Sequence, residues 1–415
     1  MNASFQHHSR STRLSIHSPT KMSTPRRNSN KGSLIFLKSC KRRISVDTNS
    51  STTTGISKDM LANASPEFRR SYFHDLRIRH PKLTETINEL MRRITNGSDR
   101  GMIILTGPAG VGKSVACEYI VQNLIKTYFQ NFPDDTQTIP AIMVEAEGTR
   151  SDRFDWYELD KEILEALQVP LIDATLPMVT RTLDGRLIDV PMVESLSHPT
   201  SRALRARFRK ALDQRNPSVV AIDEASNILA GPKTSDSKRE ANVLKTIINK
   251  NKTRLILIGA YDLYQLATKT GQLTRRSQIV HFEPYRDHSL KGFAEALSTF
   301  QDHLPFSEPF PLTAYSAELF EQSLGCIGLL KDILEATVNV AISEGKKTIA
   351  IEMLRRNYFR RLQFDTLIKE ILEGYRLIEG REYANLPAFL ARNASTKNRG
   401  RKNRPGVRSP GRDNA

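Results

Sequence analysis

The segment at residues 107–114 has the residue types and spacing of a phosphate-binding loop. It comprises Gly107, Pro108, Ala109, Gly110, Val111, Gly112, Lys113 and Ser114. Its glycines would let the backbone fold closely around a polyphosphate, so that consecutive N–H groups point at it. Lys113 would reach the β- and γ-phosphates, and the Ser114 hydroxyl would bind Mg²⁺. An accidental glycine turn is the alternative, but the pattern predicts that this loop binds ATP.

Two adjacent carboxylates supply the other groups that ATP hydrolysis needs. Asp223 and Glu224 follow the apolar residues 219–222, and open α/β sheets bind their ligands at the carboxyl ends of strands. Asp223 would bind the Mg²⁺ shell, and Glu224 would orient or deprotonate the attacking water. The alternative is that both acids only cap the next helix. Beside a phosphate-binding loop, the pair favours an ATPase over a kinase-like protein with a second substrate.

The elements that would position these residues alternate along the chain. An apolar run precedes the loop at residues 102–105, and Ala116, Ile120 and Leu124 recur behind it at helical spacing. Further patterns predict strands at residues 141–144, 219–222, 255–258 and 279–282, and helices at residues 83–94 and 157–167. Strands separated by helices predict an α/β fold with a three-layer P-loop core around a central parallel sheet.

Helices alone are predicted after residue 288. They lie at residues 289–300, 314–324, 329–343 and 351–373. The predicted organisation is therefore an ATPase core at residues 61–287 and a small helical lid domain at residues 288–391. The core carries an insertion at about residues 173–200, where Asp184-Gly185 between β-forming residues predicts a hairpin.

The net charge of +17 lies almost entirely in two tails. Residues 1–60 hold 11 Lys or Arg against 2 acidic residues, and residues 392–415 hold 8 against 1. This composition predicts disordered basic arms, which bind phosphate backbones without sequence preference. A solubilising tail and, for the first arm, an organellar presequence are the alternatives.

Membrane and metal-binding classes are disfavoured by the rest of the composition. No apolar run approaches the 20 residues that cross a bilayer. The three cysteines lie far apart without metal-ligand spacing, which suits a reducing cytoplasm. We therefore expect a cytoplasmic protein without a membrane partner.

Several further segments occur in the same order as in a known family. They are Phe68-Arg69-Arg70, His80-Pro81-Lys82-Leu83, residues 154–159, residues 204–208 and residues 272–277. With the two Walker motifs, they make the chain resemble AAA+ ATPases, and most of all the bacterial transposition ATPases of the TniB/TnsC type. The similarity spans roughly residues 65–345. The Walker motifs are specific for ATP, whereas the flanking segments count mainly through their shared order.

The resemblance implies a site shared between subunits. AAA+ proteins bind ATP between neighbouring subunits of a ring or helical filament, and an arginine of one subunit touches the γ-phosphate of the next. Arg275 and Arg276 are the candidates for this arginine finger, with a surface salt bridge as the alternative. Lys331 stands where the second domain usually supplies an arginine sensor; a plain exposed lysine is equally compatible. Residues 259–261 (Gly-Ala-Tyr) lack the usual polar sensor, which fits slow, switch-like hydrolysis.

Two basic features could contact DNA or a partner. Arg181 and Arg186 lie in the predicted hairpin, where a decorative exposed hairpin is as compatible with the pattern. The helix at residues 202–212 has an apolar stripe, and Arg202, Arg205 and Arg209 share another face. This face could follow a phosphate backbone, although a solvated or subunit-facing surface is the more ordinary outcome.

The function implied by the resemblance is an ATP-dependent regulator of DNA transposition. It would oligomerise on double-stranded target DNA in the ATP state and recruit or activate a transposase, with a target-selection protein as a further partner. Such a protein would be bacterial and nucleoid-associated. The alternative is an AAA+ replication initiator or helicase-loader-like ATPase, which usually appends a helix-turn-helix reader after the helical domain. A signalling NTPase is a third class, but it should carry repeats or an effector domain.

Overall fold

The structure is a computed structural model of the chain. It describes residues 44–47, 58–96, 101–148, 154–169, 178–183, 186–191, 200–229, 244, 253–268 and 271–380. All of these residues belong to one compact unit, Arg43–Ala415. The predicted C-terminal arm at residues 392–415 lies outside the described residues, as does nearly all of the N-terminal arm.

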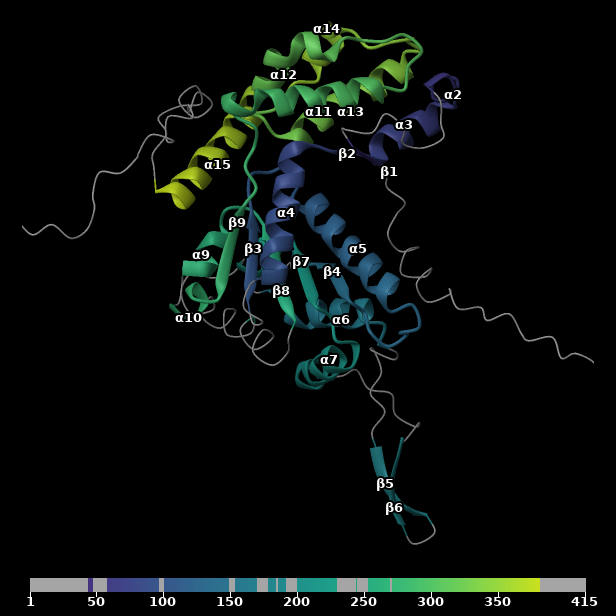
Figure 1. Cartoon of the computed structure of the whole chain (residues 1–415), viewed down its shortest axis with the longest axis vertical. Coiled ribbons are helices and arrows are strands. Elements are labelled where there is room, and N and C mark those ends of the chain that lie inside the picture. Colours follow the sequence, from purple (N-terminus) through teal and green to yellow (C-terminus); the bar gives the residue numbers. More distant parts are fainter. Residues whose placement is uncertain are drawn as a thin grey trace, which may run out of the picture. The chain divides into compact units, whose positions relative to one another are not determined.

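A five-stranded parallel sheet forms the centre of this unit (Figure 1). Its strands are β3 (Met102–Thr106), β4 (Ala141–Glu145), β7 (Val219–Asp223), β8 (Arg254–Gly259) and β9 (Ser277–His281), in the order β4-β7-β8-β3-β9. The middle strands are apolar runs buried along almost their whole length, as expected for a parallel sheet covered on both faces. The predicted α/β core with a parallel sheet is confirmed.

Helices cover the two faces of the sheet. The helix α5 (Lys113–Asn131) connects β3 to β4 and packs beside α4 (Pro81–Asn96). The connections through α6 (Trp156–Ala166) and α7 (Ser201–Arg215), and through α9 (Leu263–Thr268) and α10 (Gly271–Thr274), run in the opposite direction along the sheet. Because crossovers between parallel strands are right-handed, these helices lie on the other face. The core therefore has three layers.

The predicted helical region follows β9. It contains η2 (Asp287–Ser289), α11 (Leu290–Asp302), η3 (Leu312–Tyr315), α12 (Ser316–Gln322), α13 (Ile327–Ser343), α14 (Ile351–Arg356) and α15 (Arg361–Glu379). The prediction of a single helix at residues 351–373 is wrong, because the helix is interrupted between α14 and α15. The Asn357 side-chain amide donates to the Met353 carbonyl at 2.9 Å and to Thr337 Oγ1 at 3.3 Å. These bonds hold the end of α14, and Gln363 Oε1 then accepts from the Arg360 N–H to start α15.

A short leader precedes the core. It consists of β1 (Ile44–Asp47), α2 (Lys58–Ala62), α3 (Pro66–Asp75) and β2 (Leu76–Arg79). The strand β1 pairs with β2 in parallel, and α2 begins at Lys58, so the prediction of a wholly disordered arm over residues 1–60 is wrong at residues 44–47 and 58–60. Four residues are too few for a recognisable sequence period, and their partner strand lies far along the chain. The helix α3 packs on the helical region, with the Phe73 and Phe300 ring centroids 6.3 Å apart.

The insertion contains the predicted hairpin. The strands β5 (Met178–Leu183) and β6 (Arg186–Pro191) are antiparallel, with Leu183 opposite Arg186. The turn residues Asp184 and Gly185 lie outside the described residues, and so do the side chains of Arg181 and Arg186. The predicted roles of these two arginines therefore stay predictions.

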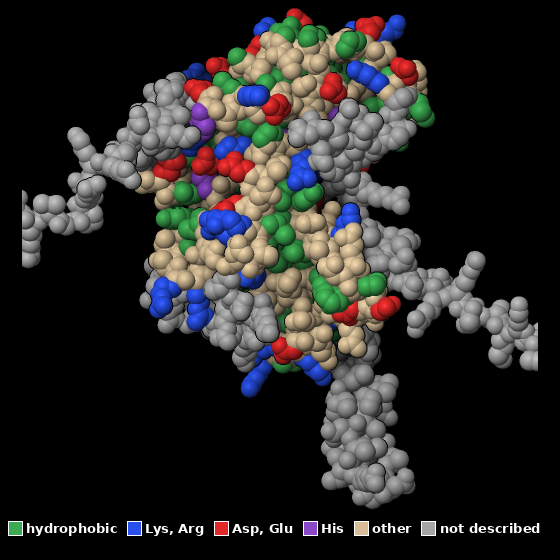
Figure 2. All heavy atoms as spheres, in the orientation of Figure 1, with side chains coloured by type: hydrophobic (Ala, Val, Ile, Leu, Met, Phe, Trp, Pro, Cys, Tyr) green, Lys and Arg blue, Asp and Glu red, His purple; other side chains and the backbone are tan. Residues whose placement is uncertain are grey.

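Two surface properties follow from the described residues. Acidic and basic side chains are interspersed on the face shown in Figure 2, which agrees with a nearly neutral folded body. No helix in the described part of the chain is long and apolar enough to cross a lipid bilayer.

Candidate functional site

The loop at residues 107–114 joins β3 to α5, and its glycines have conformations that other residues rarely adopt. Gly110 and Gly112 have φ angles of +70° and +106°. A Cβ at Gly107 would lie 2.4 Å from the Phe282 carbonyl oxygen, so only glycine fits between the loop and the end of β9. Gly112 caps α5 without any side-chain hydrogen bond to the helix. Among the described residues, no side chain caps the start of α5 at Gly112, which makes this helix end suitable for a phosphate.

The Lys113 ammonium lies within the loop itself. Its Nζ donates to the carbonyl oxygens of Gly107 and Pro108, each at 2.9 Å. Burial lowers the pKa of Lys113, and the negative charge of Glu370 is the strongest of the influences that oppose this, ahead of Glu224 and Asp223. A desolvated cation that already attracts carboxylates is suited to a phosphate group.

The two predicted carboxylates lie at the carboxyl end of β7. Asp223 is half-buried and Glu224 is exposed. The Glu224 backbone is in the left-handed region, with a φ of 47°, and its N–H donates to Asp223 Oδ1 at 2.9 Å. Both carboxylates act electrostatically on Lys113, and Asp223 also raises the pKa of Cys117 on α5, where burial is the main cause. The fold thus brings the two Walker motifs together.

Polar groups that the sequence analysis missed lie at the end of β8. The Ser226 hydroxyl donates to Asp262 Oδ1 at 2.6 Å and accepts from the Ala260 N–H at 3.1 Å. Tyr261, in contrast, is buried, and its hydroxyl lies 3.0 Å from His281 Nε2. Ser226 and Asp262 therefore lie where AAA+ proteins are expected to have their polar sensor residue. Only their place just after a strand end could have indicated them in the sequence.

A cavity of about 220 Å³ borders the loop. Its lining joins β2 and the start of α4, the loop with the start of α5, and the helices α11 and α13. The residues are Leu76, Arg77, Ile78, His80, Leu83, Val111, Gly112, Val115, Phe300, Ile327, Gly328, Lys331 and Asp332. The Gly328 N–H donates to the Gly110 carbonyl at 2.6 Å, so α13 begins directly on the loop. A mostly apolar cavity beside a phosphate site has the character expected for a nucleobase.

Lys331 lies at this cavity but is directed toward the leader. Its Nζ donates to the His74 carbonyl at 2.5 Å and lies 3.8 Å from Glu335 Oε2. Burial lowers the pKa of Lys331 to about 8, and the nearby Arg77 contributes to this. The fold brings this predicted sensor to the edge of the loop, where its side chain binds α3 and α13.

The two candidate arginine fingers lie at the opposite end of the sheet. The Met102 N–H, at the start of β3, donates to the Arg276 carbonyl at 2.9 Å. The loop follows the other end of β3, roughly 13 Å away at 3.3 Å per residue. Arg275 is exposed and Arg276 is half-buried. Neither is placed to reach the loop of its own chain.

The basic face expected on α7 is divided. Arg202 is exposed, but Arg205 Nε lies 2.8 Å from Asp160 Oδ2 on α6, with side-chain exposures of only 18% and 4%. The Arg205 guanidinium also lies over the Trp156 ring, 5.5 Å from its centroid. Arg205 is thus an internal partner of α6, and its expected place on a solvated surface is wrong.

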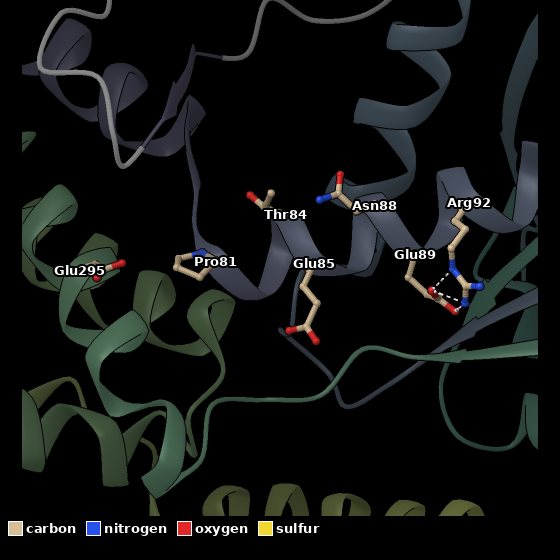
Figure 3. Close-up of a pocket in the computed structure, with 7 residues that line it drawn as sticks. All are labelled: Pro81, Thr84, Glu85, Asn88, Glu89, Arg92 and Glu295. Carbon is tan, nitrogen blue, oxygen red and sulfur yellow. Dashed lines mark hydrogen bonds and ion pairs between the residues drawn. The ribbon is translucent and has the colours of Figure 1, made fainter.

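A second cavity, larger than the first, lies elsewhere and contains none of the predicted site residues. It is an open groove of about 690 Å³ along α4, and Glu295 of α11 lines it near Pro81 (Figure 3). Glu89, on its wall, already accepts from Arg92 and Arg93 at 2.6–2.9 Å. The groove has no group arranged for catalysis.

Comparison with protein families matches residues 75–267, a little under half of the chain, to the family described as "AAA domain". No curated protein sequence matches the chain. Among solved structures, the Aeropyrum pernix ORC2 protein in its ADPNP–ADP complexes is 12% identical, with a TM-score of 0.45 and 66% of each chain covered. The Aeropyrum pernix ORC1 protein in complex with DNA is 14% identical, with a TM-score of 0.42; the match covers 72% of this chain and 66% of that one.

The Walker-type ATPase paby2304 of Pyrococcus abyssi is 15% identical, with a TM-score of 0.41 and coverage of 71% of this chain and 76% of that one. The chain therefore spans slightly less than two thirds of the length of the two Aeropyrum proteins. With TM-scores below 0.5, these structures are similar to it only in broad outline.

Proposed function

Because the chain carries an AAA-type P-loop ATPase domain, we propose that it binds and slowly hydrolyses ATP and that the nucleotide state controls its assembly on DNA. The observation that carries this proposal is the uncapped N-terminus of α5 next to Lys113, with Asp223 and Glu224 acting on that lysine. This set offers a seat for the phosphates, a positive charge for the terminal ones and carboxylates for a metal and a water.

Each residue of the site would have a separate task. The N–H groups at the start of α5 would hold the phosphates, and Lys113 would exchange its two carbonyl acceptors for phosphate oxygens. Ser114 and Asp223 would hold Mg²⁺, which when bound neutralises phosphate charge and orients the terminal phosphoryl group. Glu224 is exposed, so it has access to water and would orient or deprotonate the attacking molecule.

Self-association would complete the site. Arg275 and Arg276 lie one strand length from their own loop, so a guanidinium could stabilise charge on the γ-phosphate only in a neighbouring copy. Lys331 would add positive charge at the lid side, without the bidentate geometry of an arginine. Assembly into a ring or helical filament would thus depend on ATP.

Slow hydrolysis is supported by the end of β8. Tyr261 is buried and bonded to His281, and the polar groups there, Ser226 and Asp262, are bonded to each other. A sensor already engaged within the chain contributes little to orienting a water. The protein would therefore act as a switch rather than as a fast motor.

The DNA-related role rests on the basic tails and on the resemblance to TniB/TnsC proteins. We propose that the ATP-bound assembly contacts double-stranded DNA and regulates a transposase, with a target-selection protein as a further partner. Deleting residues 392–415 should weaken DNA binding and make it less dependent on salt concentration. Unchanged binding would mean that this arm contacts partner proteins rather than DNA. A neighbouring gene for an integrase-like transposase would favour this role, and a replication origin the alternative of an initiator or helicase loader.

The central test compares two lysines of α5. Lys113→Ala should lose binding of a fluorescent ATP analogue and ATP-dependent sedimentation with duplex DNA. Lys126→Ala, at an exposed position of the same helix, should leave both unchanged. Unchanged nucleotide affinity of Lys113→Ala would refute the proposed ATP site. If the wild-type protein stays monomeric in the presence of ATP and duplex DNA, the proposed assembly is refuted.

A further inference from the structure

The last described helix, α15, returns from the helical region and packs on the carboxyl end of the sheet. A Cβ at Gly374 would lie 2.2 Å from the Tyr261 ring, so the backbone of α15 packs directly against Tyr261, just after the end of β8. Tyr375 is completely buried. Its ring lies 4.8 Å from that of His281, at the end of β9, and 3.9 Å from the Arg286 guanidinium. This is a specific docking site for α15.

One turn before Gly374, the same helix reaches the phosphate-binding loop. Glu370 Oε1 accepts a hydrogen bond from the Ala109 N–H at 3.2 Å, between residues 261 positions apart in the chain. Among neighbouring charges, Glu370 also has the strongest attraction for Lys113, stronger than that of Glu224 or Asp223. A carboxylate from outside the core thus takes one loop N–H and lies close to the loop cation.

The position of Glu370 corresponds to the terminal-phosphate end of the site. The α5 end of the loop holds the inner phosphates, whereas the lysine reaches the β- and γ-phosphates. Lys113 Nζ lies against the carbonyls of Gly107 and Pro108, next to Ala109. A γ-phosphate bound by Lys113 would therefore compete with the Glu370 carboxylate for the same part of the loop. The two groups also carry charge of the same sign, so proximity is unfavourable.

We propose that Glu370 is a nucleotide-specificity residue that substitutes for the γ-phosphate, so that α15 stays docked in the ADP-bound or empty site and is displaced by ATP. This inference rests on the proposed binding of ATP at the loop. ATP would remove Glu370 from the Ala109 N–H and, with it, loosen the contacts of Gly374 and Tyr375. ADP lacks the competing phosphate and would leave them intact. The nucleotide state would thereby be transmitted to the segment that follows α15.

The first test replaces the carboxylate and keeps its size. In the full-length protein, Glu370→Gln should bind a non-hydrolysable ATP analogue on the order of tenfold more tightly than the wild type, about 1.4 kcal/mol. Its affinity for ADP should change much less, because only the γ-phosphate meets Glu370. Glu373→Gln, at an exposed position of the same helix, is the matched control and should alter neither affinity.

The second test displaces α15 without touching its charge. Gly374→Ala places a methyl group against the Tyr261 ring and should raise the affinity for the ATP analogue in the same direction. Hydrogen exchange of residues 367–379 should be slow with ADP and faster with the ATP analogue in the wild type, and fast with both in Gly374→Ala.

The outcomes separate this inference from the proposed function. If the wild type binds both nucleotides but Glu370→Gln gains no preference for the ATP analogue, or loses affinity for it, the inference is overturned and the ATP site stands. If no form of the protein binds nucleotide, the site itself is refuted, and the role of Glu370 with it.

Discussion

Removal of the Arg205 guanidinium should destabilise the core, although five other Lys or Arg residues lie on the same helix, α7. Arg205 Nε is 2.8 Å from Asp160 Oδ2, and the Asp160 side chain is only 4% exposed. The second oxygen of this carboxylate, Oδ1, has no hydrogen-bond partner among the described residues. Arg205→Ala would leave a buried carboxylate without the guanidinium with which it forms an ion pair.

The expected cost follows from this geometry. Breaking a buried ion pair by removing one partner costs about 3–5 kcal/mol. Arg205 keeps 18% exposure, which places the loss near the lower end, at about 3 kcal/mol. Burial raises the pKa of Asp160 to about 7, and the Arg205 guanidinium opposes this rise. Without Arg205 the carboxyl would protonate more readily, so the loss should be larger at pH 8 than at pH 6.

The chain provides its own probe for the measurement. Trp156 is the single tryptophan of the chain and lies under the Arg205 side chain. Unfolding by guanidinium chloride can therefore be followed by the fluorescence of Trp156. Arg202→Ala, at an exposed position of α7, is the matched control and should stay within about 0.5 kcal/mol of the wild type. The double variant Asp160→Leu/Arg205→Leu should recover most of the loss. Equal stabilities of Arg205→Ala and Arg202→Ala would refute the assignment of Arg205 as an internal residue.

Three further predictions concern the ATP site and its surroundings. Glu224→Gln should bind ATP normally but hydrolyse it at least about 100-fold more slowly, as expected for a lost general base; normal phosphate release would remove Glu224 from that role. Of Arg275→Ala and Arg276→Ala, at least one should bind ATP without hydrolysing it and should regain turnover when mixed with Lys113→Ala protein, because each supplies what the other lacks; no recovery would argue against an arginine acting between copies. Burial lowers the pKa of His80 to about 3, so His80 stays neutral in the folded state while it becomes protonated in the unfolded state. Its contribution to the free energy of unfolding is therefore complete above pH 6.5, and it declines below that value by about 1.4 kcal/mol per pH unit. Urea melts of His80→Gln between pH 7.5 and 5 should therefore show a shallower decline than the wild type, and parallel declines would contradict the prediction.

The sequence alone was sufficient for the features whose physical cause is local. Gly110 and Gly112 have backbone conformations that other residues rarely adopt, and at Gly107 a Cβ would clash with the Phe282 carbonyl. Continuous apolar runs indicate buried parallel strands, and Asp223-Glu224 at the end of such a run lies at the ligand-binding edge of the sheet. The α/β core, the helical region and the hairpin at residues 178–191 were all predictable in this way.

Only the tertiary structure decided which distant groups meet. The pairing of Arg205 with Asp160, the docking of Glu370 on the Ala109 N–H and the strand pairing of residues 44–47 all join segments far apart in the chain. A helical pattern shows that Arg205 and Glu370 are on particular faces, but it does not show what packs against those faces. Their partners are set by the way the whole unit buries its apolar surface, because a buried charge is tolerated only where the fold supplies an opposite charge or a hydrogen bond.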